Sequence, residues 1–216
     1  MKSNTIQISC DGGAATGKST GAKLISKKYK LKFLSSGLLY RYAAKLILDH
    51  APKNKISFLK SRFNSLNYAN LNKINLHSQK ISIFSAKIAR VNSIRKILKK
   101  YQKNFAKKNK NCCIEGRDIS TKIIPRSDVK FFFKCNLNLA AKRRFKELKK
   151  IDKNVKFSEI KKALRIRNIS DIKRKNSPLL KHPESIEIDS GKLSKLAMVA
   201  KMSKFIDKVI KKKYGS

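Results

Sequence analysis

An eight-residue segment near the amino terminus restricts the fold of this chain more than any other feature. It matches the pattern G-x-x-x-x-G-K-[ST] and reads Gly12-Gly13-Ala14-Ala15-Thr16-Gly17-Lys18-Ser19. A short alternating run precedes it, from Thr5 to Cys10, and residues at helical spacing follow it at Ala22, Ile25 and Tyr29. The pattern carries weight only between a strand and a helix, and both are expected here. We therefore predict a strand, a glycine-rich turn and a helix from residue 17 onward.

A turn of this kind binds phosphate groups. Its glycines let the backbone wrap around a phosphate, and its N–H groups point to the anion at the positive end of the following helix. Lys18 is expected to bridge the β- and γ-phosphates of a nucleotide, and the Ser19 hydroxyl to face Mg²⁺, directly or through a water. A plain strand–helix turn with incidental glycines is the weaker alternative, because the chain has only eight glycines.

Length and composition indicate one domain of ordinary size. The chain has 216 residues, of which 41% are hydrophobic, enough for a core. No apolar run approaches the roughly 20 residues that cross a bilayer. The first strand begins so early that we expect no signal peptide. The cysteines lack C-x-x-C spacing and lie in or beside predicted strands, which favours reduced core thiols in a cytoplasmic protein. They are Cys10, Cys112, Cys113 and Cys135.

The formal net charge of +41 raises the question of nucleic-acid binding. Proteins with that role usually cluster their cations on one face or in one tail, whereas lysine is spread over every segment of this chain. The abundance of Lys, Asn and Ile resembles the codon bias of an AT-rich genome. We therefore expect neither a specific nucleic-acid partner nor a membrane partner.

Arginine is the rarer cation, with only eleven among the 54 basic residues. In a chain that uses lysine by default, arginine should persist where a rigid bidentate group must grip a phosphate or a carbonyl edge. The arginines fall into a few clusters, each beside another local motif. They are Arg41, Arg62, Arg90, Arg95, Arg117, Arg126, Arg143, Arg144, Arg165, Arg167 and Arg174.

Strand and helix signals alternate along the chain. Strands are predicted at 5–10, 31–35, 111–114, 129–134 and 185–188, and helices at 17–29, 37–49, 92–108, 136–150 and 190–213. This alternation is typical of α/β proteins with a mostly parallel sheet and helices on both faces. Ligands of such sheets bind at the carboxyl ends of the strands, where the phosphate loop falls.

Two segments interrupt the alternation. Residues about 51–90 are polar, Asn-rich and weakly patterned, and predict a small inserted flap. Residues about 150–178 are charged and periodic, and predict a lid. The core of the single domain would then comprise residues about 1–50, 91–150 and 179–216. A phosphate loop with two segments able to close over it suggests a kinase that shields its reaction from water.

Two short motifs stand at the ends of predicted strands. Ser36-Gly37-Leu38-Leu39-Tyr40-Arg41 follows the second strand, and Ser36 is expected to cap the next helix. Glu115-Gly116-Arg117-Asp118 closes the third strand, where Arg117 could clamp a phosphate and Asp118 could accept a hydrogen bond from an exocyclic amine. A structural salt bridge is the alternative for Arg117 and Asp118.

Further charged motifs follow the fourth predicted strand. Arg143 and Arg144 lie on the next predicted helix. Arg167, Asp171 and Arg174 have the spacing i, i+4 and i+7, which places them on one helix face. An exposed, ion-paired helix is the alternative for that spacing.

Taken in order, these motifs resemble bacterial cytidylate kinases. The resemblance covers most of the chain and is weakest at about 51–80. The phosphate loop alone occurs in many NTPases, whereas the later motifs together are fairly specific. They are S-G-x-x-Y-R from Ser36, R-K-x-L-x-x-x-Q from Arg95, E-G-R-D from Glu115, the pair at 143–144, R-x-x-x-D-x-x-R-x-x-S-P-L from Arg167, and Ile188-Asp189-Ser190.

The resemblance implies a nucleoside-monophosphate kinase: a phosphate-loop NTPase fold with a five-stranded parallel sheet, an NMP-binding flap and a lid. ATP would be the donor, Mg²⁺ the metal, and CMP or dCMP the acceptor, in a monomer. The ATP-binding residues would be Gly12, Gly13, Ala14, Ala15, Thr16, Gly17, Lys18, Ser19 and Thr20. The catalytic cations would be Lys18, Arg117, Arg143, Arg144 and Arg167. The substrate-binding residues would be Ser36, Tyr40, Arg41, Arg95, Arg117, Asp118, Asp171 and Arg174, with Arg95 and Asp118 reading the cytosine.

The sequence departs from the family pattern at several points. Ser35 stands where the family usually has Asp before Ser-Gly. Ala86, beside Ser85, stands where a serine is expected nine residues before Arg95. Asn168 replaces the Asp that normally follows the lid arginine, and the insert is shorter than the bacterial norm.

Two other functions are compatible with the motifs. A phosphate-loop kinase could act on another acceptor, such as a different NMP or shikimate, and contacts of Asp118 and Arg95 with a base edge would distinguish the two. A nucleic-acid-binding or regulatory NTPase would instead hydrolyse NTP without an acceptor and bind DNA or RNA at physiological salt.

Overall fold

The computed structural model describes residues 5–150 and 152–215. Residues 1–4 and 216 of the predicted core segments, and residue 151 of the predicted lid, lie outside the described residues. Five parallel strands form one sheet in the order β2-β3-β1-β4-β5. All five overlap the predicted strands, so the parallel sheet is confirmed. Their bounds are β1 (Gln7–Gly12), β2 (Lys32–Ser35), β3 (Cys112–Gly116), β4 (Val129–Lys134) and β5 (Ile186–Asp189).

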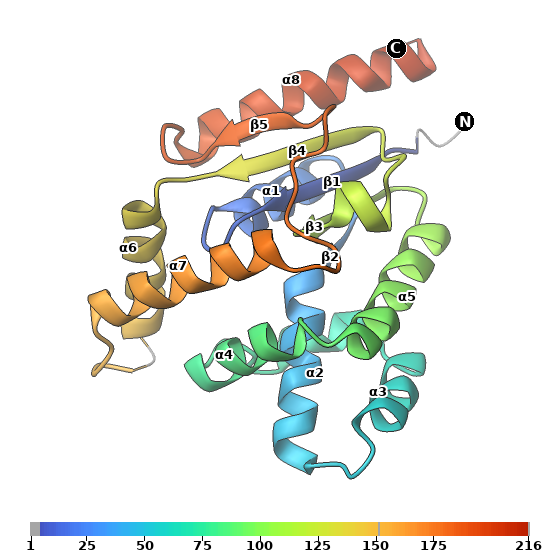
Figure 1. The fold of residues 1–216 in the computed structure, drawn as a ribbon. Coiled ribbons are helices and arrows are strands. Elements are labelled where there is room, and N and C mark those ends of the chain that lie inside the picture. Colours follow the sequence, from blue (N-terminus) through green and yellow to red (C-terminus); the bar gives the residue numbers. More distant parts are fainter. Residues whose placement is uncertain (1–4, 151, 216) are drawn as a thin grey trace.

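Helices cover both faces of this sheet (Figure 1). Helices α1 (Lys18–Lys28) and α8 (Lys195–Tyr214) pack on one face, and α5 (Asn92–Lys108) with the π-helical turn η2 (Ile119–Ile123) on the other. In Figure 1, α2 to α5 gather on the side of the sheet opposite α8. The remaining helices are α2 (Ser36–His50), α3 (Lys55–Asn64), the 3₁₀ helix η1 (Tyr68–Lys73), α4 (Gln79–Ile88), α6 (Leu137–Lys149) and α7 (Phe157–Lys173).

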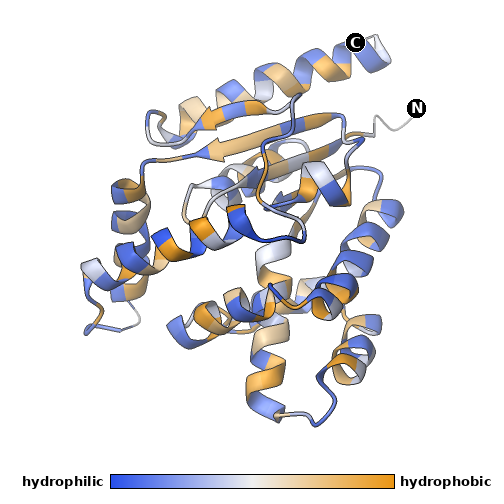
Figure 2. Cartoon of the chain, in the orientation of Figure 1, coloured by the Kyte–Doolittle hydropathy of each residue, from blue (hydrophilic) through white to orange (hydrophobic). Residues whose placement is uncertain are grey.

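The side chains of the central strand β1 are buried on both faces of the sheet. Ile8 and Cys10 are buried with residues of α1 and α8, whereas Asp11 on the other face bonds to η2. Strand β4 is mostly hydrophobic in Figure 2, as expected for a strand covered on both sides. The described cysteines are free thiols, as predicted, with Cys135 the least buried of the four.

The predicted flap is helical. Within the described residues 51–90, α3, η1 and α4 are the regular elements. Three of the polar residues in this segment are helix caps. The side chains of Asn54, Asn67 and Ser78 each accept hydrogen bonds from backbone N–H groups in the first turn of their helix. The apolar sides of these helices join a single cluster with α2 and α5. Capping and long-range packing therefore explain a segment that has little local periodicity.

Three local expectations need correction. Ser35, not Ser36, caps α2: Ser35 is extended, and its Oγ accepts from Leu38 N at 3.3 Å, whereas Ser36 is already helical. The last helix begins at Lys195 rather than at 190, because the Ser194 side chain caps it. Arg174 is not on the face of α7, since the helix ends at Lys173 and Arg174 has extended backbone angles of −65° and 135°.

Candidate active site

The phosphate loop connects β1 to α1, and two of its glycines are required by geometry. Gly12 has a φ of +154°, and a Cβ there would lie 2.4 Å from the carbonyl oxygen of Phe133. Gly17, with a φ of +77°, immediately precedes α1. Side chains are excluded at the first position by contact and disfavoured at both by the backbone angle. The loop therefore holds the strand–turn–helix geometry that its sequence predicts.

Lys18 is buried at the base of this loop. Its Nζ donates to Gly13 O at 3.1 Å and lies 3.8 Å from Glu115 Oε2. Burial, followed by the charge of Arg117, lowers the pKa of Lys18 to about 7, although Glu115 opposes the shift. A phosphate group near Lys18 would reverse this shift, because an anion favours the ammonium form.

Glu115 is a site residue that sequence reasoning missed. It lies at the end of β3, in register with Cys10 of β1, and so beside the phosphate loop. Its Oε1 accepts from Ser19 Oγ at 3.0 Å and from Ser35 Oγ, and its Oε2 is buried without a hydrogen-bond partner among the described residues. The E-G-R-D motif could have identified Glu115 as a site residue. A carboxylate near the carboxyl end of a strand that pairs with β1 lies beside the phosphate loop.

Several arginines converge on the mouth of the loop from different elements. Asp171 of α7 accepts from Arg117 Nε at 2.8 Å and from Arg174 Nη1 at 3.1 Å. Burial alone would raise the pKa of Asp171, but Arg117 and Arg167 hold it below its usual value. Burial and then Arg117 lower the pKa of Arg167 to about 9. The three arginines thus outnumber the carboxylates of Asp171 and Asp118 beside them, which is the electrostatic condition for binding an anion.

A second buried cluster lies beside the first. Arg95 Nη2 donates to Asp118 Oδ2 at 2.8 Å, and both residues are almost fully buried, at 2% and 4% exposure. The Arg95 guanidinium lies over the Tyr40 ring, 5.6 Å from its centre, and Arg174 Nη2 is 4.0 Å from Asp118 Oδ1. Three buried polar atoms of this cluster lack hydrogen-bond partners among the described residues: Tyr40 Oη, Arg95 Nε and Arg174 Nη2. Unsatisfied buried polar atoms are rare, so this cluster has the character of a binding site.

The adjacent arginines of α6 point to different places, because successive helix residues are about 100° apart. Arg143 donates to Ser190 Oγ at 2.9 Å and to Ser190 O at 2.8 Å, and Ser190 Oγ donates to Thr16 O at 2.7 Å. Arg143 therefore links the end of β5 to the phosphate loop. Arg144 instead donates to the backbone of His77 at 3.4 Å and faces the insert.

Helix α7 touches the phosphate loop directly. Ala14 N donates to Asn168 Oδ1 at 3.0 Å. Asn168 is one of the positions at which the sequence departs from the family pattern. Asn168 Oδ1 therefore accepts from a backbone N–H that the sequence predicts to face a phosphate.

The structure thus brings most of the predicted site residues into two neighbouring groups. The first surrounds the loop and the second lies behind it, near α2 and α5.

Other predicted residues lie around these groups. Ser36 is buried beside Gly116, and a Cβ added at Gly116 would be 3.1 Å from the Cβ of Ser36. Thr20 is exposed on α1. Ser85 is buried on α4, with its Oγ donating to Ser82 O at 2.8 Å. A separate cavity of about 520 Å³ lies between α7 with the segment that follows it and the turn after α4, and it shares Arg174 with the second group.

Comparisons with known proteins identify the family of this chain. The family model described as "Cytidylate kinase" matches residues 8–208. The chain is 39% identical over 210 residues to a cytidylate kinase of Bartonella tribocorum, covering 94% of this chain and 95% of that protein. It is 32% identical over 205 residues to a cytidylate kinase of Rickettsia africae, covering 94% and 93%.

Solved structures agree in fold. A shikimate kinase from Bacteroides thetaiotaomicron is similar with a TM-score of 0.54 at 9% identity, covering 94% of this chain and 99% of that one. An uncharacterized protein from Eubacterium ventriosum reaches a TM-score of 0.55 at 16% identity, with the same coverages. Among the described residues, no helix is long and apolar enough to cross a membrane. Because the family model and both relatives span nearly the whole chain, this protein belongs to the cytidylate kinase family.

Proposed function

We propose that this chain transfers the γ-phosphoryl group of ATP to CMP or dCMP, giving ADP and CDP or dCDP. One observation carries the proposal beyond family membership. The phosphate loop adjoins a buried Arg95–Asp118 pair whose neighbours Tyr40 and Arg174 keep polar atoms without partners. A site of that kind suits an acceptor that has both a phosphate and a base with an exocyclic amine.

The residues at the loop fit a nucleotide with Mg²⁺. The described residues contain no group of three or more His, Cys, Asp or Glu side chains that could hold a metal by themselves. Mg²⁺ needs no such group, since it usually binds through one or two protein oxygens, water and substrate phosphates. Ser19 Oγ and the unpartnered Oε2 of Glu115 are the oxygens that would hold it. The ion would neutralise charge on the transferring phosphate.

The chain's own residues supply positioning and charge. Lys18 would contact the β- and γ-phosphates, while Arg41 and Arg117 hold the acceptor phosphate and Arg167 neutralises the phosphoryl group in transfer. No general base is required, because the acceptor phosphate is already largely ionised at neutral pH. Catalysis then depends on bringing two anions together, which the excess of cations in this cluster makes possible.

The buried cluster around Arg95 and Asp118 would determine which nucleobase the acceptor site binds. Cytosine offers an amine donor where uracil offers a carbonyl acceptor, so the Asp118 carboxylate attracts the first and repels the second. Arg95 orients Asp118 by its hydrogen bond. Asp171 would orient the sugar or hold the arginines around it. Ser36, Tyr40 and Arg174 line the acceptor side, and Arg143 and Arg144 remain predicted contacts of the phosphoryl group.

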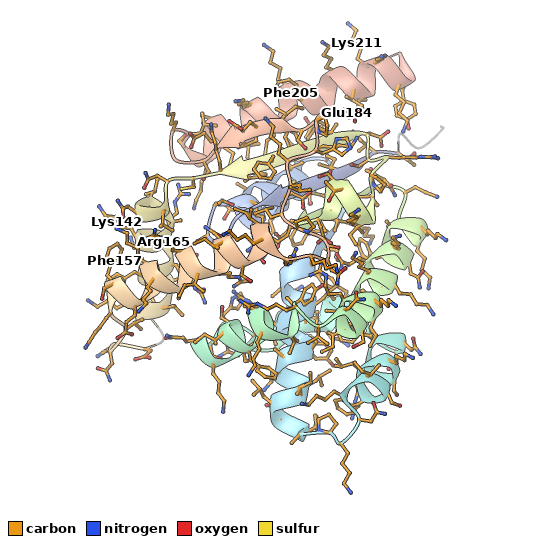
Figure 3. The ribbon with its side chains drawn as sticks, viewed as in Figure 1. Lys142, Phe157, Arg165, Glu184, Phe205 and Lys211 are labelled. Carbon is orange, nitrogen blue, oxygen red and sulfur yellow. The ribbon has the colours of Figure 1, made fainter. Side chains whose placement is uncertain are left out.

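We also propose that the enzyme is a monomer in the cytoplasm; the family resemblance supports the first, and the free cysteines support the second. Exposed cations are spread over distant elements, as Lys142 on α6, Arg165 on α7 and Lys211 on α8 illustrate (Figure 3). This spread supports the prediction that nucleic acid is not a specific partner.

A coupled ADP-release assay with CMP, dCMP, UMP, AMP, GMP and shikimate tests the proposal. We expect turnover with CMP and dCMP well above that with the other acceptors. Preference for another acceptor would overturn the assignment of substrate. ADP release that does not depend on an acceptor, together with retention on DNA or RNA at physiological salt, would favour a nucleic-acid-dependent NTPase instead.

A further inference from the structure

A histidine from the insert lies against the arginines of the phosphate cluster. His77 is in the loop between η1 and α4, and it is a partly exposed residue. Its Nδ1 lies 2.8 Å from Arg41 Nη1, and its backbone carbonyl accepts from Arg144 Nη2 at 3.4 Å. The ring thus contacts one arginine of the anion site and the backbone of the same residue contacts a second, which puts the imidazole within reach of the anion.

The contact with Arg41 defines the protonation state of His77. A guanidinium only donates hydrogen bonds, so Nδ1 must be the acceptor and the ring must be neutral. The charged groups facing the ring from other elements are Lys23 of α1, Arg41 of α2, and Arg144 and Glu147 of α6. Burial, followed by Arg41 and Arg144, lowers the pKa of His77 below its ordinary value, and Glu147 opposes this only in part.

We infer that His77 is a further substrate-binding residue, which releases Arg41 to the acceptor phosphate and becomes protonated as that phosphate binds. The inference rests on the proposed function, since it needs a phosphate-bearing acceptor at Arg41. The proton comes from solvent and binds to the Nδ1 lone pair that Arg41 no longer occupies. The imidazolium then donates an N–H to a phosphate oxygen.

The electrostatics favour this exchange. A dianionic phosphate beside Arg41 and Arg144 reverses the field that keeps His77 neutral, and a nearby anion stabilises the charged imidazole. Its N–H bond to the phosphate is charge-assisted on both sides and therefore among the stronger hydrogen bonds. The insert would thus contribute a cation only when an anion is present, and so avoid permanent repulsion with Arg41.

A purely structural His77 would behave differently. In that case the ring only supports Arg41, remains neutral with substrate bound, and has the same titration with and without CMP. The distinction can be measured directly, because the chain has only three histidines, His50, His77 and His182.

Proton NMR of the histidine ring signals in the full chain tests the inference. The signals are assigned from single His→Gln variants and followed against pH with CMP present or absent, and without ATP so that no turnover occurs. We expect the titration midpoint of His77 to rise by about one unit with CMP, while those of His50 and His182 stay in place. The phosphorus signal of CMP gives the phosphate's own titration in the same samples.

Variants give a second, independent readout by calorimetry. We expect His77→Gln to weaken CMP binding roughly tenfold at pH 6.5 and less at pH 8. His77→Lys should keep the affinity and lose only the part of the pH dependence that does not come from the CMP phosphate itself, and His50→Gln should match the wild type.

CMP binding with an unmoved His77 midpoint, or a His77→Gln variant with wild-type affinity at both pH values, would overturn the inference. No CMP binding to the wild type at all would overturn the proposed function as well.

Discussion

The Asp11 carboxylate holds Ser120: its Oδ2 accepts from the backbone N of Ser120 at 2.8 Å and from its Oγ at 2.6 Å. Ile119 N donates to the other oxygen at 2.8 Å. Asp11 lies at the end of β1 where the phosphate loop begins, and η2 directly follows Arg117 and Asp118. This single buried side chain therefore fixes the distance between the ATP-binding loop and the residues assigned to the acceptor.

Asp11→Asn should destabilise the protein and impair catalysis together. An amide has only one acceptor oxygen, so one of the backbone N–H groups of η2 would face an NH₂ group instead. We expect the free energy of unfolding to fall by about 1–3 kcal/mol at pH 7, and KM for the acceptor to rise. Denaturant unfolding and steady-state kinetics measure both. Unchanged values for both would show that the link between β1 and η2 is not needed.

The pH dependence of that variant has a definite sign. Burial raises the pKa of Asp11 to about 6, although its hydrogen bonds to Ser120 and Ile119 oppose the shift. Between about pH 4 and about pH 6, Asp11 therefore binds more protons in the folded state than in the unfolded state. The contribution of Asp11 to the free energy of unfolding consequently falls as pH rises. The difference in unfolding free energy between wild type and Asp11→Asn should therefore decrease across this range and level off above it. A difference that grows with pH would contradict the assignment.

Lys18→Met should abolish transfer without loss of stability. Loss of one preorganised charge in a dry site costs on the order of 10²–10³ in rate. The pKa of Lys18 is lowered to about 7, so holding its ammonium in the folded protein is unfavourable at neutral pH, and this cost disappears above its ordinary pKa. We expect a melting temperature at pH 7 at least equal to that of the wild type. A well-folded variant with normal turnover would refute the assignment of the phosphate loop.

Arg117→Lys tests whether this position needs the planar shape of a guanidinium group and not only its charge. Arg117 Nε donates to Asp171 at 2.8 Å, and the planar guanidinium can hold this carboxylate and a phosphate at once, which an ammonium cannot. We expect kcat/KM to fall roughly 100-fold although the charge is kept. Arg62→Lys is the matched control, because Arg62 is exposed on α3 and lies over the Phe58 ring. Equal effects of the two substitutions would contradict the geometric argument.

Asp118→Asn should narrow the preference for cytosine. An amide can turn its NH₂ toward the uracil carbonyl, so the variant loses the repulsion that excludes UMP. The ratio of kcat/KM values for CMP and UMP at saturating Mg-ATP should fall at least tenfold. Because Arg95 is buried and would lose an ionic partner, circular dichroism must accompany the assay. A folded variant with the wild-type ratio would move base recognition away from Asp118.

Local sequence predicted the sheet, the phosphate loop and most of the site. The strands are recognisable because each is a short run, either apolar or alternating, that lies beside turn residues. The loop was recognisable because its glycines and Lys18 lie consecutively in the chain. The motif order also placed Arg95, Arg117 and Asp118 in one family site, and the structure brings them close together.

Only the tertiary structure decided how those motifs meet. Glu115 faces Ser19 because β3 pairs with β1, and Asp11 holds Ser120 because η2 folds back over the same strand. The helices of the insert depend on caps and on burial against α2 and α5, which a search for local periodicity does not detect. His77 reaches Arg41 across 36 positions of the sequence for the same reason. Contacts between distant residues follow from packing, and no spacing within a single segment encodes them.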